Sequence, residues 1–180
     1  MQVIGGKLKG KKLANCKSKS IRPAMGLVRK SIFDTLKNLV NGANVLDLFA
    51  GTGIVGIEAI SRGAKSLVVV DSNPLSVKLI RKNLSICNIE ATVILAKLPA
   101  VLNSKTLKDL EFDLIFIDPP YGHNKLIENI LEQLINNSIL SKNGLIFIES
   151  EAKSDFTIPE QLEIYKEKLF GNTKLTILKN

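Results

Sequence analysis

The residues best suited to chemistry in this chain begin with a glycine-rich turn and two aspartates. Residues 45–56 run from an apolar segment through Gly51-Thr52-Gly53 to Gly56, with the spacing G-x-G-x-x-G. Asp71 follows Gly51 by 20 residues, where a carboxylate can accept both ribose hydroxyls of a nucleoside cofactor. Asp47 precedes the turn, at the end of a buried strand, and would repel the pyrophosphate of a dinucleotide.

These carboxylates favour a cationic nucleoside ligand. S-adenosylmethionine offers an adenosine to Asp71 and a cationic methionine end to Asp47 and the loop that runs through Phe49, Ala50, Gly51 and Gly53. Purely structural interpretations stay open, since Asp71 could cap a helix starting at Pro74 and Asp47 could hydrogen-bond the loop. The glycine motif alone is also compatible with a nicotinamide oxidoreductase.

A second group of candidate residues is the tetrapeptide Asp118-Pro119-Pro120-Tyr121, which ends an apolar run starting at Phe112. Ligands of open α/β sheets bind at the carboxyl ends of strands, so this turn is expected at the same crevice as Gly51. The prolines offer no N–H and leave their carbonyls free to accept hydrogen bonds. Asp118, the Pro119 carbonyl and the ring of Tyr121 therefore suit a planar base amine, which has two N–H donors and a π face.

The formal net charge of +8 comes from one end of the chain. Residues 1–33 hold nine cations and no acidic residue, whereas the rest carries 16 basic and 17 acidic side chains. Such a block attracts a polyanion such as RNA, although a solvated tail is the simpler alternative. Alternating apolar and basic residues with turn glycines over 3–10 predict a small hairpin. The expected RNA contacts are Lys7, Lys9, Lys11, Lys12, Arg22, Arg29 and Lys30.

Apolar and helical patterns alternate along the rest of the chain, which predicts a mostly parallel sheet with helices on both faces. Two further strands, joined at Gly171-Asn172, should pair antiparallel at one edge of the sheet. The expected strands are Asn44–Phe49, Lys65–Asp71, Ala91–Ala96, Phe112–Asp118, Leu145–Glu149, Leu162–Phe170 and Lys174–Lys179, and the expected helices are Leu27–Val40, Ile54–Arg62, Pro74–Cys87 and Leu126–Asn137.

Length and composition limit the classes of protein to which the chain can belong. With 180 residues, 45% of them hydrophobic, it can fold as one domain with a modest extension. We expect a basic RNA-binding extension at 1–24 and an α/β domain at 25–180. No apolar run reaches the ~20 residues of a membrane span, and two isolated cysteines predict neither a disulfide framework nor a metal site. These features predict a cytoplasmic protein without a metal or a membrane partner.

Together these motifs resemble the class I S-adenosylmethionine-dependent methyltransferases that modify exocyclic amines. The shared residues are the Asp-x-Phe-x-Gly-x-Gly motif (47–53), Asp71 and Asp-Pro-Pro-Tyr (118–121). The Ile4-Gly5-Gly6 turn, the basic run 9–13, the segment 21–23, Val28-Arg29 and Phe33 are similar to the RsmD-type methyltransferases of bacterial small-subunit ribosomal RNA.

The resemblance implies transfer of a methyl group to the N2 amine of a guanine in 16S ribosomal RNA. It also implies a Rossmann-like sheet of seven strands, the last inserted antiparallel, in a monomer acting on the RNA or on the assembling small subunit. Asp118, Pro119 and Tyr121 would then be the catalytic residues. Asp118 also belongs to the expected cofactor site, as does Ser72 next to Asp71.

Two stretches depart from the pattern of the family. Ala24, Met25, Gly26 and Lys30 stand where relatives usually have Thr, Asp and Glu. After the third strand, Leu95-Ala96-Lys97-Leu98 replaces the Asp-Ala that holds the adenine amine in relatives. The adenine contact is then expected from backbone groups, those of Lys97 and Leu98 among them, or from elsewhere.

Two other functions remain open from the sequence. A DNA adenine-N6 methyltransferase would use the same acceptor group for a different base amine. An RNA-binding protein that retains the cofactor fold without catalysis would explain the basic end, but it would not need Asp118 to Tyr121.

Overall fold

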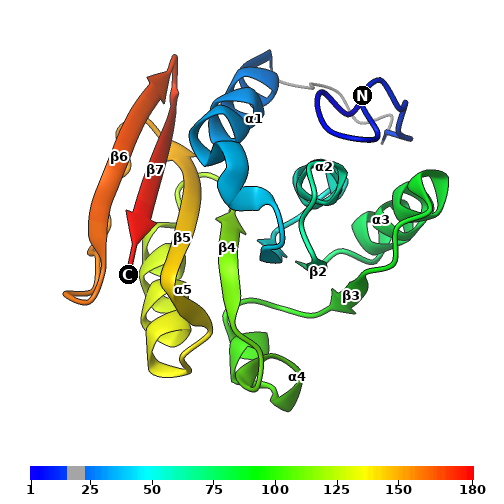
Figure 1. The fold of residues 1–180 in the computed structure, drawn as a ribbon. Helices are drawn as coiled ribbons and strands as arrows, with labels where there is room; N and C mark the ends of the chain where they lie inside the picture. The colour runs from blue at the N-terminus through cyan, green and yellow to red at the C-terminus, as the bar shows by residue number, and fades with distance from the viewer. Residues whose placement is uncertain (16–22) are drawn as a thin grey trace.

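A computed structural model describes residues 1–15 and 23–180 of the chain and has a seven-stranded sheet at its centre (Figure 1). The order of the strands across the sheet is β3-β2-β1-β4-β5-β7-β6. The strands are β1 (Asn44–Leu48), β2 (Ser66–Asp71), β3 (Thr92–Leu95), β4 (Phe112–Ile117), β5 (Leu140–Glu151), β6 (Glu163–Phe170) and β7 (Thr173–Lys179). The helices are α1 (Pro23–Leu36), α2 (Ile54–Ser61), α3 (Pro74–Cys87), α4 (Lys105–Lys108) and α5 (Asn124–Asn136), with 3₁₀ turns η1 (Lys37–Val40) and η2 (Ala100–Asn103).

The first five strands are parallel, and β7 runs antiparallel to both of its neighbours, β5 and β6. The order of β1 to β5 reverses at β1, which lies between β2 and β4. In open parallel sheets such a switch point leaves a crevice at the carboxyl ends of the strands, because the connections on either side go to opposite faces. The expected Rossmann-like architecture and its antiparallel C-terminal pair are confirmed.

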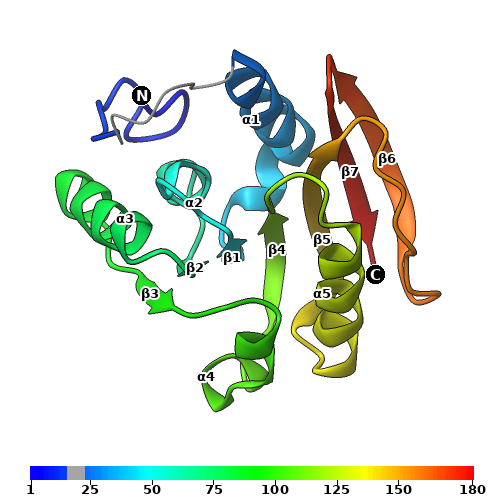
Figure 2. The ribbon, with the colours of Figure 1, turned by 180° about the vertical axis from the view of Figure 1, so that it is seen from behind.

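Helices cover both faces of the sheet, as Figure 2 also shows from behind. One apolar core joins the sheet to the buried sides of α1, α2 and α3, including Phe33, Ile57 and Ile80. The other joins it to α5, η2 and α4, including Ile130, Leu102 and Leu107. Residues of a strand alternate between these cores, since Val45 belongs to the first and Leu46 to the second.

Some element boundaries differ from those expected. The first helix begins at Pro23 rather than Leu27, because proline fits the first helical position, where no N–H partner is required. It ends at Leu36 and continues as a 3₁₀ turn to Val40. The fifth strand spans Leu140–Glu151 rather than Leu145–Glu149, because Leu140 pairs with Phe112 across an irregularity in the register.

Residues 1–15 form a folded arm. Its ends are joined by an antiparallel bridge between Gln2 and Lys12, and the Val3 N–H donates to the Lys11 carbonyl at 3.1 Å. Val3 is fully buried in the α1–α3 core. Residues 5–10 form bends and turns rather than paired strands. In the described part of the arm, the predicted hairpin is therefore present only as a single bridge at its base. The expected division between residues 24 and 25 falls in the first turn of α1.

Candidate functional site

The expected site residues lie at the carboxyl ends of β1, β2 and β4. Leu48 is level with Val70 on one side and with Ile117 on the other. The next residues, Phe49, Asp71 and Asp118, therefore lie at the same edge of the sheet, where Asp71 is the last residue of β2. The pairing continues one step, because the Asp118 N–H donates to the Leu48 carbonyl at 3.4 Å. Residues 20 to 70 positions apart are thus brought to one crevice.

The loop between β1 and α2 folds back tightly over this edge. Phe49, Gly51 and Gly53 all have positive φ, of 59°, 58° and 74°. Glycine adopts this conformation freely, whereas at Phe49 it marks a strained residue of the kind found at functional sites. The Gly53 N–H donates to the Ala50 carbonyl at 2.8 Å, and α2 begins at the next residue. Backbone groups of the loop are therefore held at a helix N-terminus.

Asp71 holds this loop closed. One oxygen, Oδ2, accepts the Gly51 N–H at 2.8 Å, and Oδ1 accepts the Asn73 N–H at 2.8 Å. The N-cap of α3 is Asn73, which accepts the Leu75 N–H, so the alternative that Asp71 caps this helix is wrong. Each carboxylate oxygen has a further lone pair, so Asp71 can still accept ribose hydroxyls.

The loop after β3 lies beside Asp71. The Ala96 N–H donates to the Asp71 carbonyl at 3.1 Å, which places Lys97 and Leu98 next to the end of β2. The Lys97 side chain is exposed and Leu98 is half-buried. Ser72 is exposed at the start of the turn into α3. These three expected cofactor residues therefore share one rim of the crevice with Asp71.

Asp47 is buried beneath the loop, with 3% of its surface exposed. Its Oδ2 accepts the Gly56 N–H in the first turn of α2 at 3.0 Å. This agrees with the alternative interpretation that Asp47 hydrogen-bonds the glycine motif. Gly56 permits this approach, because a Cβ there would lie 2.7 Å from Leu67 Cδ1 and 3.2 Å from Asp47 Oδ2. The third glycine of the motif thus brings the helix close to both β1 and β2.

The surroundings of Asp47 disfavour its negative charge. Burial raises the pKa of its carboxyl group to about 7, the Gly56 hydrogen bond opposes this shift, and the charges of Asp118 and Asp71 reinforce it. Three carboxylates therefore converge on one crevice. A cationic ligand would relieve their mutual repulsion, whereas a phosphate would increase it.

The Asp-Pro-Pro-Tyr turn forms the opposite rim. Asp118 is exposed, Pro119 is buried and Tyr121 is half-buried. The Tyr121 hydroxyl lies 2.9 Å from Thr173 Oγ1, so the first residue of β7 fixes the far end of the aromatic ring. A small hollow extends from this turn to the end of β5, where Ser150 and Glu151 line it. The structure thus joins Asp118, Pro119 and Tyr121 in one turn, and Asp118 is the exposed one of these three.

Polar side chains on α2 hold the N-terminal arm against the domain. The Ile4 N–H donates to Glu58 Oε2 at 2.8 Å, and the Leu8 N–H donates to Ser61 Oγ at 2.9 Å. Glu58 is fully buried and pairs with Arg62 at 2.9 Å. At Gly6 a Cβ would lie 1.9 Å from the Ser61 carbonyl oxygen, so only glycine allows the arm to approach α2 this closely.

The expected RNA-binding residues have different surroundings. The four arm lysines, Lys7, Lys9, Lys11 and Lys12, are exposed, and Lys30 is exposed but pairs with Asp34 at 2.8 Å. The Arg29 side chain is 11% exposed, lies 3.9 Å from Glu58 and donates to the Gln2 carbonyl at 3.2 Å. Its burial lowers the pKa of its guanidinium group. This arginine therefore also ties the arm to α1. Arg22 lies outside the described residues.

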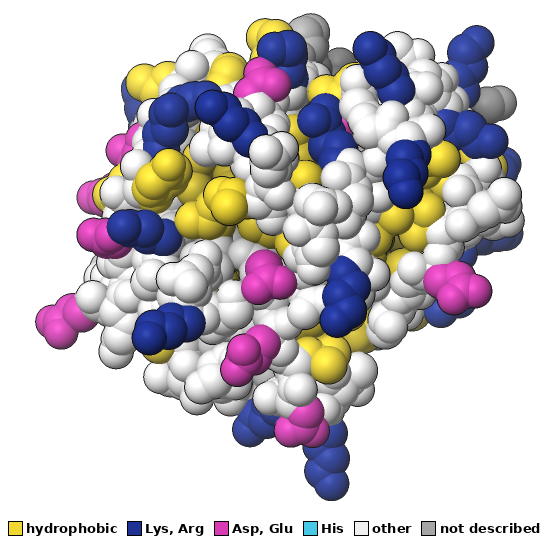
Figure 3. All heavy atoms as spheres, viewed as in Figure 1, with side chains coloured by type: hydrophobic (Ala, Val, Ile, Leu, Met, Phe, Trp, Pro, Cys, Tyr) yellow, Lys and Arg dark blue, Asp and Glu magenta, His cyan; other side chains and the backbone are white. Residues whose placement is uncertain are grey.

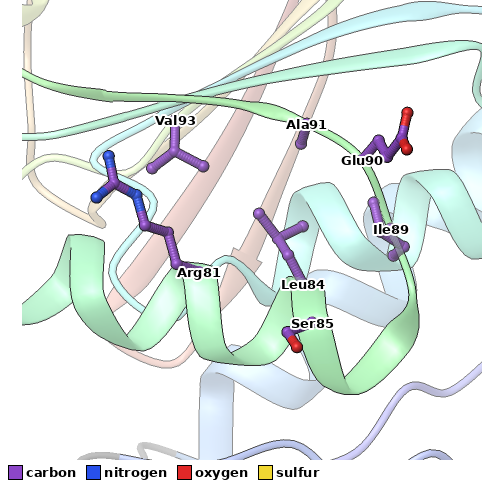
Figure 4. A pocket seen from close by; sticks show the side chains of 7 residues that line it. All are labelled: Arg81, Leu84, Ser85, Ile89, Glu90, Ala91 and Val93. Atoms are coloured by element: carbon purple, nitrogen blue, oxygen red, sulfur yellow. The ribbon is translucent and has the colours of Figure 1, made fainter.

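Three further cations, which the sequence did not lead us to predict as RNA contacts, lie on the exposed side of α3. Lys78, Arg81 and Lys82 form no ion pair with any residue that the structure describes. Figure 3 shows Lys and Arg side chains gathered over the arm and α3. In Figure 4, Arg81 and Glu90 lie at opposite ends of a hollow floored by Leu84 and Val93, and the carboxylate points away. The absence of any acidic residue from Pro74 to Cys87 could have signalled this basic face.

Glu58, Ser61 and Asn83 also escaped the sequence reasoning. They stand in helices, where isolated polar residues usually indicate an exposed face, yet all three are buried. Their partners are backbone groups of the arm, more than 50 positions away in the chain. No local pattern could have identified them.

Two kinds of feature are missing from the part of the chain that the structure describes. None of its helices has the length and apolar character needed to cross a membrane. Within residues 1–15 and 23–180, no group of three or more His, Cys, Asp or Glu side chains is arranged to hold a metal ion.

Comparisons with known proteins agree with this geometry. The family described as Conserved hypothetical protein 95 matches residues 1–179. A ribosomal RNA small subunit methyltransferase D from Buchnera aphidicola (subsp. Acyrthosiphon pisum, strain APS) is 33% identical over 93% of this chain and 86% of its own length. The protein of the same name from Escherichia coli K12 is 30% identical over 95% and 85%. The solved structure of a putative methyltransferase, yhhF, from Escherichia coli superposes with a TM-score of 0.89 at 27% identity and covers 100% of this chain and 97% of that one.

Proposed function

The chain belongs to the RsmD family of ribosomal RNA small subunit methyltransferases, and from this premise we propose that it methylates the N2 amine of a guanine in 16S ribosomal RNA with S-adenosylmethionine as the donor. The observation that carries the proposal is the meeting of Asp71, Asp47 and the Asp118 turn at one edge of the sheet. One side of this crevice suits a cationic nucleoside and the other suits a base amine.

The residues of the crevice fit S-adenosylmethionine. Asp71 would accept the ribose hydroxyls, while Asp47 and the backbone of the glycine loop from Phe49 to Gly53 would receive the cationic methionine end. Ser72, Lys97 and Leu98 border the place of the nucleoside. Two acidic side chains around this loop disfavour a pyrophosphate, which counts against a nicotinamide cofactor. When bound, the donor supplies a methyl group made electrophilic by a sulfonium centre.

The acceptor side activates the amine by hydrogen bonding. A guanine N2 lone pair is delocalised into the ring and attacks poorly until the nitrogen becomes pyramidal. The Asp118 carboxylate and the Pro119 carbonyl would accept its two N–H groups, favour this geometry and disperse the positive charge that develops on nitrogen. Asp118 is exposed, so its carboxylate can pass the released proton to water. The ring of Tyr121 would stack on a base turned out of its helix.

The basic arm would bind the phosphate backbone of the RNA. Its four exposed lysines lie on a loop anchored to α2, and Lys78, Arg81 and Lys82 extend the positive surface along α3. Arg22, Arg29 and Lys30 complete the proposed set, with Arg29 acting in part through its contact with the arm. We further propose that the arm, residues 1–24, and the domain, residues 25–180, act together in a cytoplasmic monomer that needs no metal.

Transfer of a tritiated methyl group from S-adenosylmethionine tests the proposal. The acceptors are 16S ribosomal RNA and small subunits from a strain that lacks this enzyme, with a DNA duplex as a control. The expected product is N2-methylguanine in the ribosomal RNA after nuclease digestion. Methylation of adenine in DNA would favour the DNA methyltransferase instead. Tight binding of RNA and cofactor without any transfer would favour a non-catalytic RNA-binding protein.

A further inference from the structure

Asn83 is a buried amide on α3 that the proposed chemistry does not use. It is 0% exposed and lies among apolar residues of the same helix face, such as Ile80 and Leu84. An amide in such a place destabilises the fold unless its polar atoms are hydrogen-bonded. Asn83 is therefore expected to have specific partners.

Those partners lie in two segments with different proposed roles. Asn83 Nδ2 donates to the carbonyl of Thr52, in the glycine loop, at 2.9 Å. The same nitrogen donates to the Ala14 carbonyl at 3.2 Å, and Asn83 Oδ1 accepts the Ala14 N–H at 2.8 Å. One side chain thus bonds to both the proposed cofactor loop and the C-terminal end of the described arm.

The link continues on either side of Asn83. Thr52 stands between Gly51 and Gly53, and the Gly51 N–H is bonded to Asp71. A hydrogen-bonded path therefore runs from the proposed ribose-binding carboxylate through the loop to Ala14. The Thr52 hydroxyl also donates to Met1 Sδ at 3.6 Å. Both ends of the described arm thus depend on the position of one loop residue.

We propose that Asn83 is a positioning residue through which the cofactor on the glycine loop and RNA on the basic arm strengthen each other's binding. This inference rests on the proposed function. A ligand in contact with the loop favours one orientation of the Thr52 carbonyl, and the Asn83 amide follows that orientation because Nδ2 bonds to it. The same amide fixes Ala14, so the arm is held in one arrangement before RNA arrives, which lowers the entropic cost of binding.

Affinity for RNA with and without the cofactor product tests this coupling. S-adenosylhomocysteine is used because it cannot donate a methyl group, and the RNA probes are transcribed 16S ribosomal RNA and small subunits lacking the modification. For the unmodified chain, saturating S-adenosylhomocysteine should lower the Kd for RNA by about fivefold or more, the lower end of typical coupling between sites. Because coupling is reciprocal, RNA should tighten S-adenosylhomocysteine binding by the same factor.

Two variants break the link at different bonds. Asn83→Ala removes all three hydrogen bonds, and Ala14→Pro removes the N–H that Asn83 Oδ1 accepts at 2.8 Å, leaving the two bonds that Nδ2 donates to the Thr52 and Ala14 carbonyls. Both should reduce the coupling factor towards one and raise KM for RNA more than they lower kcat. Asn103→Ala is the matched control, because Asn103 is an exposed amide bonded to Gln133 and Asn137 beside α5. It should retain the full coupling.

The outcomes separate this inference from the proposed function. If the unmodified chain binds both ligands but its affinity for RNA does not respond to S-adenosylhomocysteine, the coupling is refuted while the function stands. Retention of full coupling in folded Ala14→Pro would also refute it. Thermal unfolding reports whether each variant folds. If Asn83→Ala does not fold, the coupling measured for Ala14→Pro tests the inference. Failure of the unmodified chain to bind either ligand would overturn the function and the coupling together.

Discussion

Carboxylates at the edge of the sheet formed by β1, β2 and β4 have different surroundings from those in the C-terminal pair β6–β7. At the first, Asp47 is buried, and its pKa is raised by burial and by two neighbouring carboxylates. At the second, Glu163 pairs with Lys179 and Glu167 lies 3.9 Å from Lys174. The pairing with Glu163 raises the pKa of Lys179. Charges are therefore balanced where strands only need to associate, and unbalanced where a cationic ligand is proposed to bind.

Cations of the N-terminal arm and α3 also differ from those of the C-terminal pair. Those of the arm and α3 form no ion pair with residues in the described part of the chain, whereas Lys174 and Lys179 of β7 do. Unpaired charge contributes little to folding, but it attracts a charged partner and speeds its association. The edge at β1, β2 and β4 meets the C-terminal pair where Tyr121, in the turn after β4, contacts Thr173 of β7. The C-terminal pair thus supports the proposed acceptor turn without supplying its charge.

The largest expected effect comes from Asp118→Ala. Loss of one acceptor of the amine should reduce kcat for methyl transfer by about 100-fold or more, the range seen when one preorganised hydrogen-bonding group is removed. Affinity for S-adenosylhomocysteine, measured by calorimetry, should change little. An equal loss in both quantities would place Asp118 in the cofactor site alone. Glu163→Gln, in the paired region, is the control and should leave both quantities unchanged.

Asp71→Ala should act on the opposite side of the crevice. Removal of a charged hydrogen-bond acceptor should weaken S-adenosylhomocysteine binding by about 1.5 to 3 kcal/mol. Asp71→Asn retains one acceptor oxygen for the Gly51 N–H and should lose less. A dissociation constant unchanged in both variants would remove the ribose assignment.

The unpaired cations should determine how RNA binding responds to salt. Replacing Lys9, Lys11 and Lys12 together by Gln should reduce the slope of log K against log salt by roughly 2 to 3, because each phosphate contact contributes about 0.7 to 0.9. The same replacement of Lys78, Arg81 and Lys82 tests the face of α3. Lys142, Lys153 and Lys166 are exposed cations outside this surface, and their replacement should leave the slope unchanged. If all three variants kept the slope of the unmodified protein, neither surface would bind RNA.

A smaller effect should appear as a pH dependence of cofactor affinity. The pKa of Asp47 is raised to about 7, so its carboxyl group is increasingly ionised as the pH rises through that value. Because the ionised form attracts a cationic ligand, affinity for S-adenosylmethionine should increase from about pH 6 to about pH 8. Asp47→Asn should remove this dependence. A flat profile for the unmodified protein would contradict the contact.

The linked effect on stability has the opposite sign. In the unfolded chain Asp47 has its usual pKa of 3.8, whereas in the folded protein its pKa is about 7. Between about pH 4 and about pH 7 the folded form therefore holds a proton that the unfolded form has lost. The free energy of unfolding contributed by this group is therefore greatest below about pH 4 and decreases up to about pH 7. The melting temperature of the ligand-free protein should therefore decrease more between about pH 4 and about pH 7 than the melting temperature of Asp47→Asn.

The sequence predicted the features of this molecule that depend on local patterns. The alternation of apolar and helical segments indicated the order of the strands along the chain, and the helix Pro74–Cys87 was predicted with both of its ends correct. The switch-point rule brought Gly51, Asp71 and Asp118 to one edge. Parallel strands align their carboxyl ends, so residues at strand ends can be placed together before any contact is known.

Features that depend on tertiary contacts were not predictable in the same way. The burial of Glu58 and Asn83 follows from the docking of the arm, and no periodicity within α2 or α3 indicates it. The partial burial of Arg29 has the same cause. The N-cap role assigned to Asp71 as an alternative failed because Asn73, two residues later, takes it. Local hydrogen bonds of this kind depend on where the chain turns.

A structure of the protein with S-adenosylhomocysteine and a 16S ribosomal RNA fragment would show whether the cofactor and the target base meet at this edge of the sheet. We expect the ribose hydroxyls at Asp71, the sulfur facing the turn at Asp118, and a guanine whose N2 lies within hydrogen-bond distance of Asp118 and the Pro119 carbonyl. A cofactor bound away from the glycine loop, or a base amine held elsewhere, would contradict it.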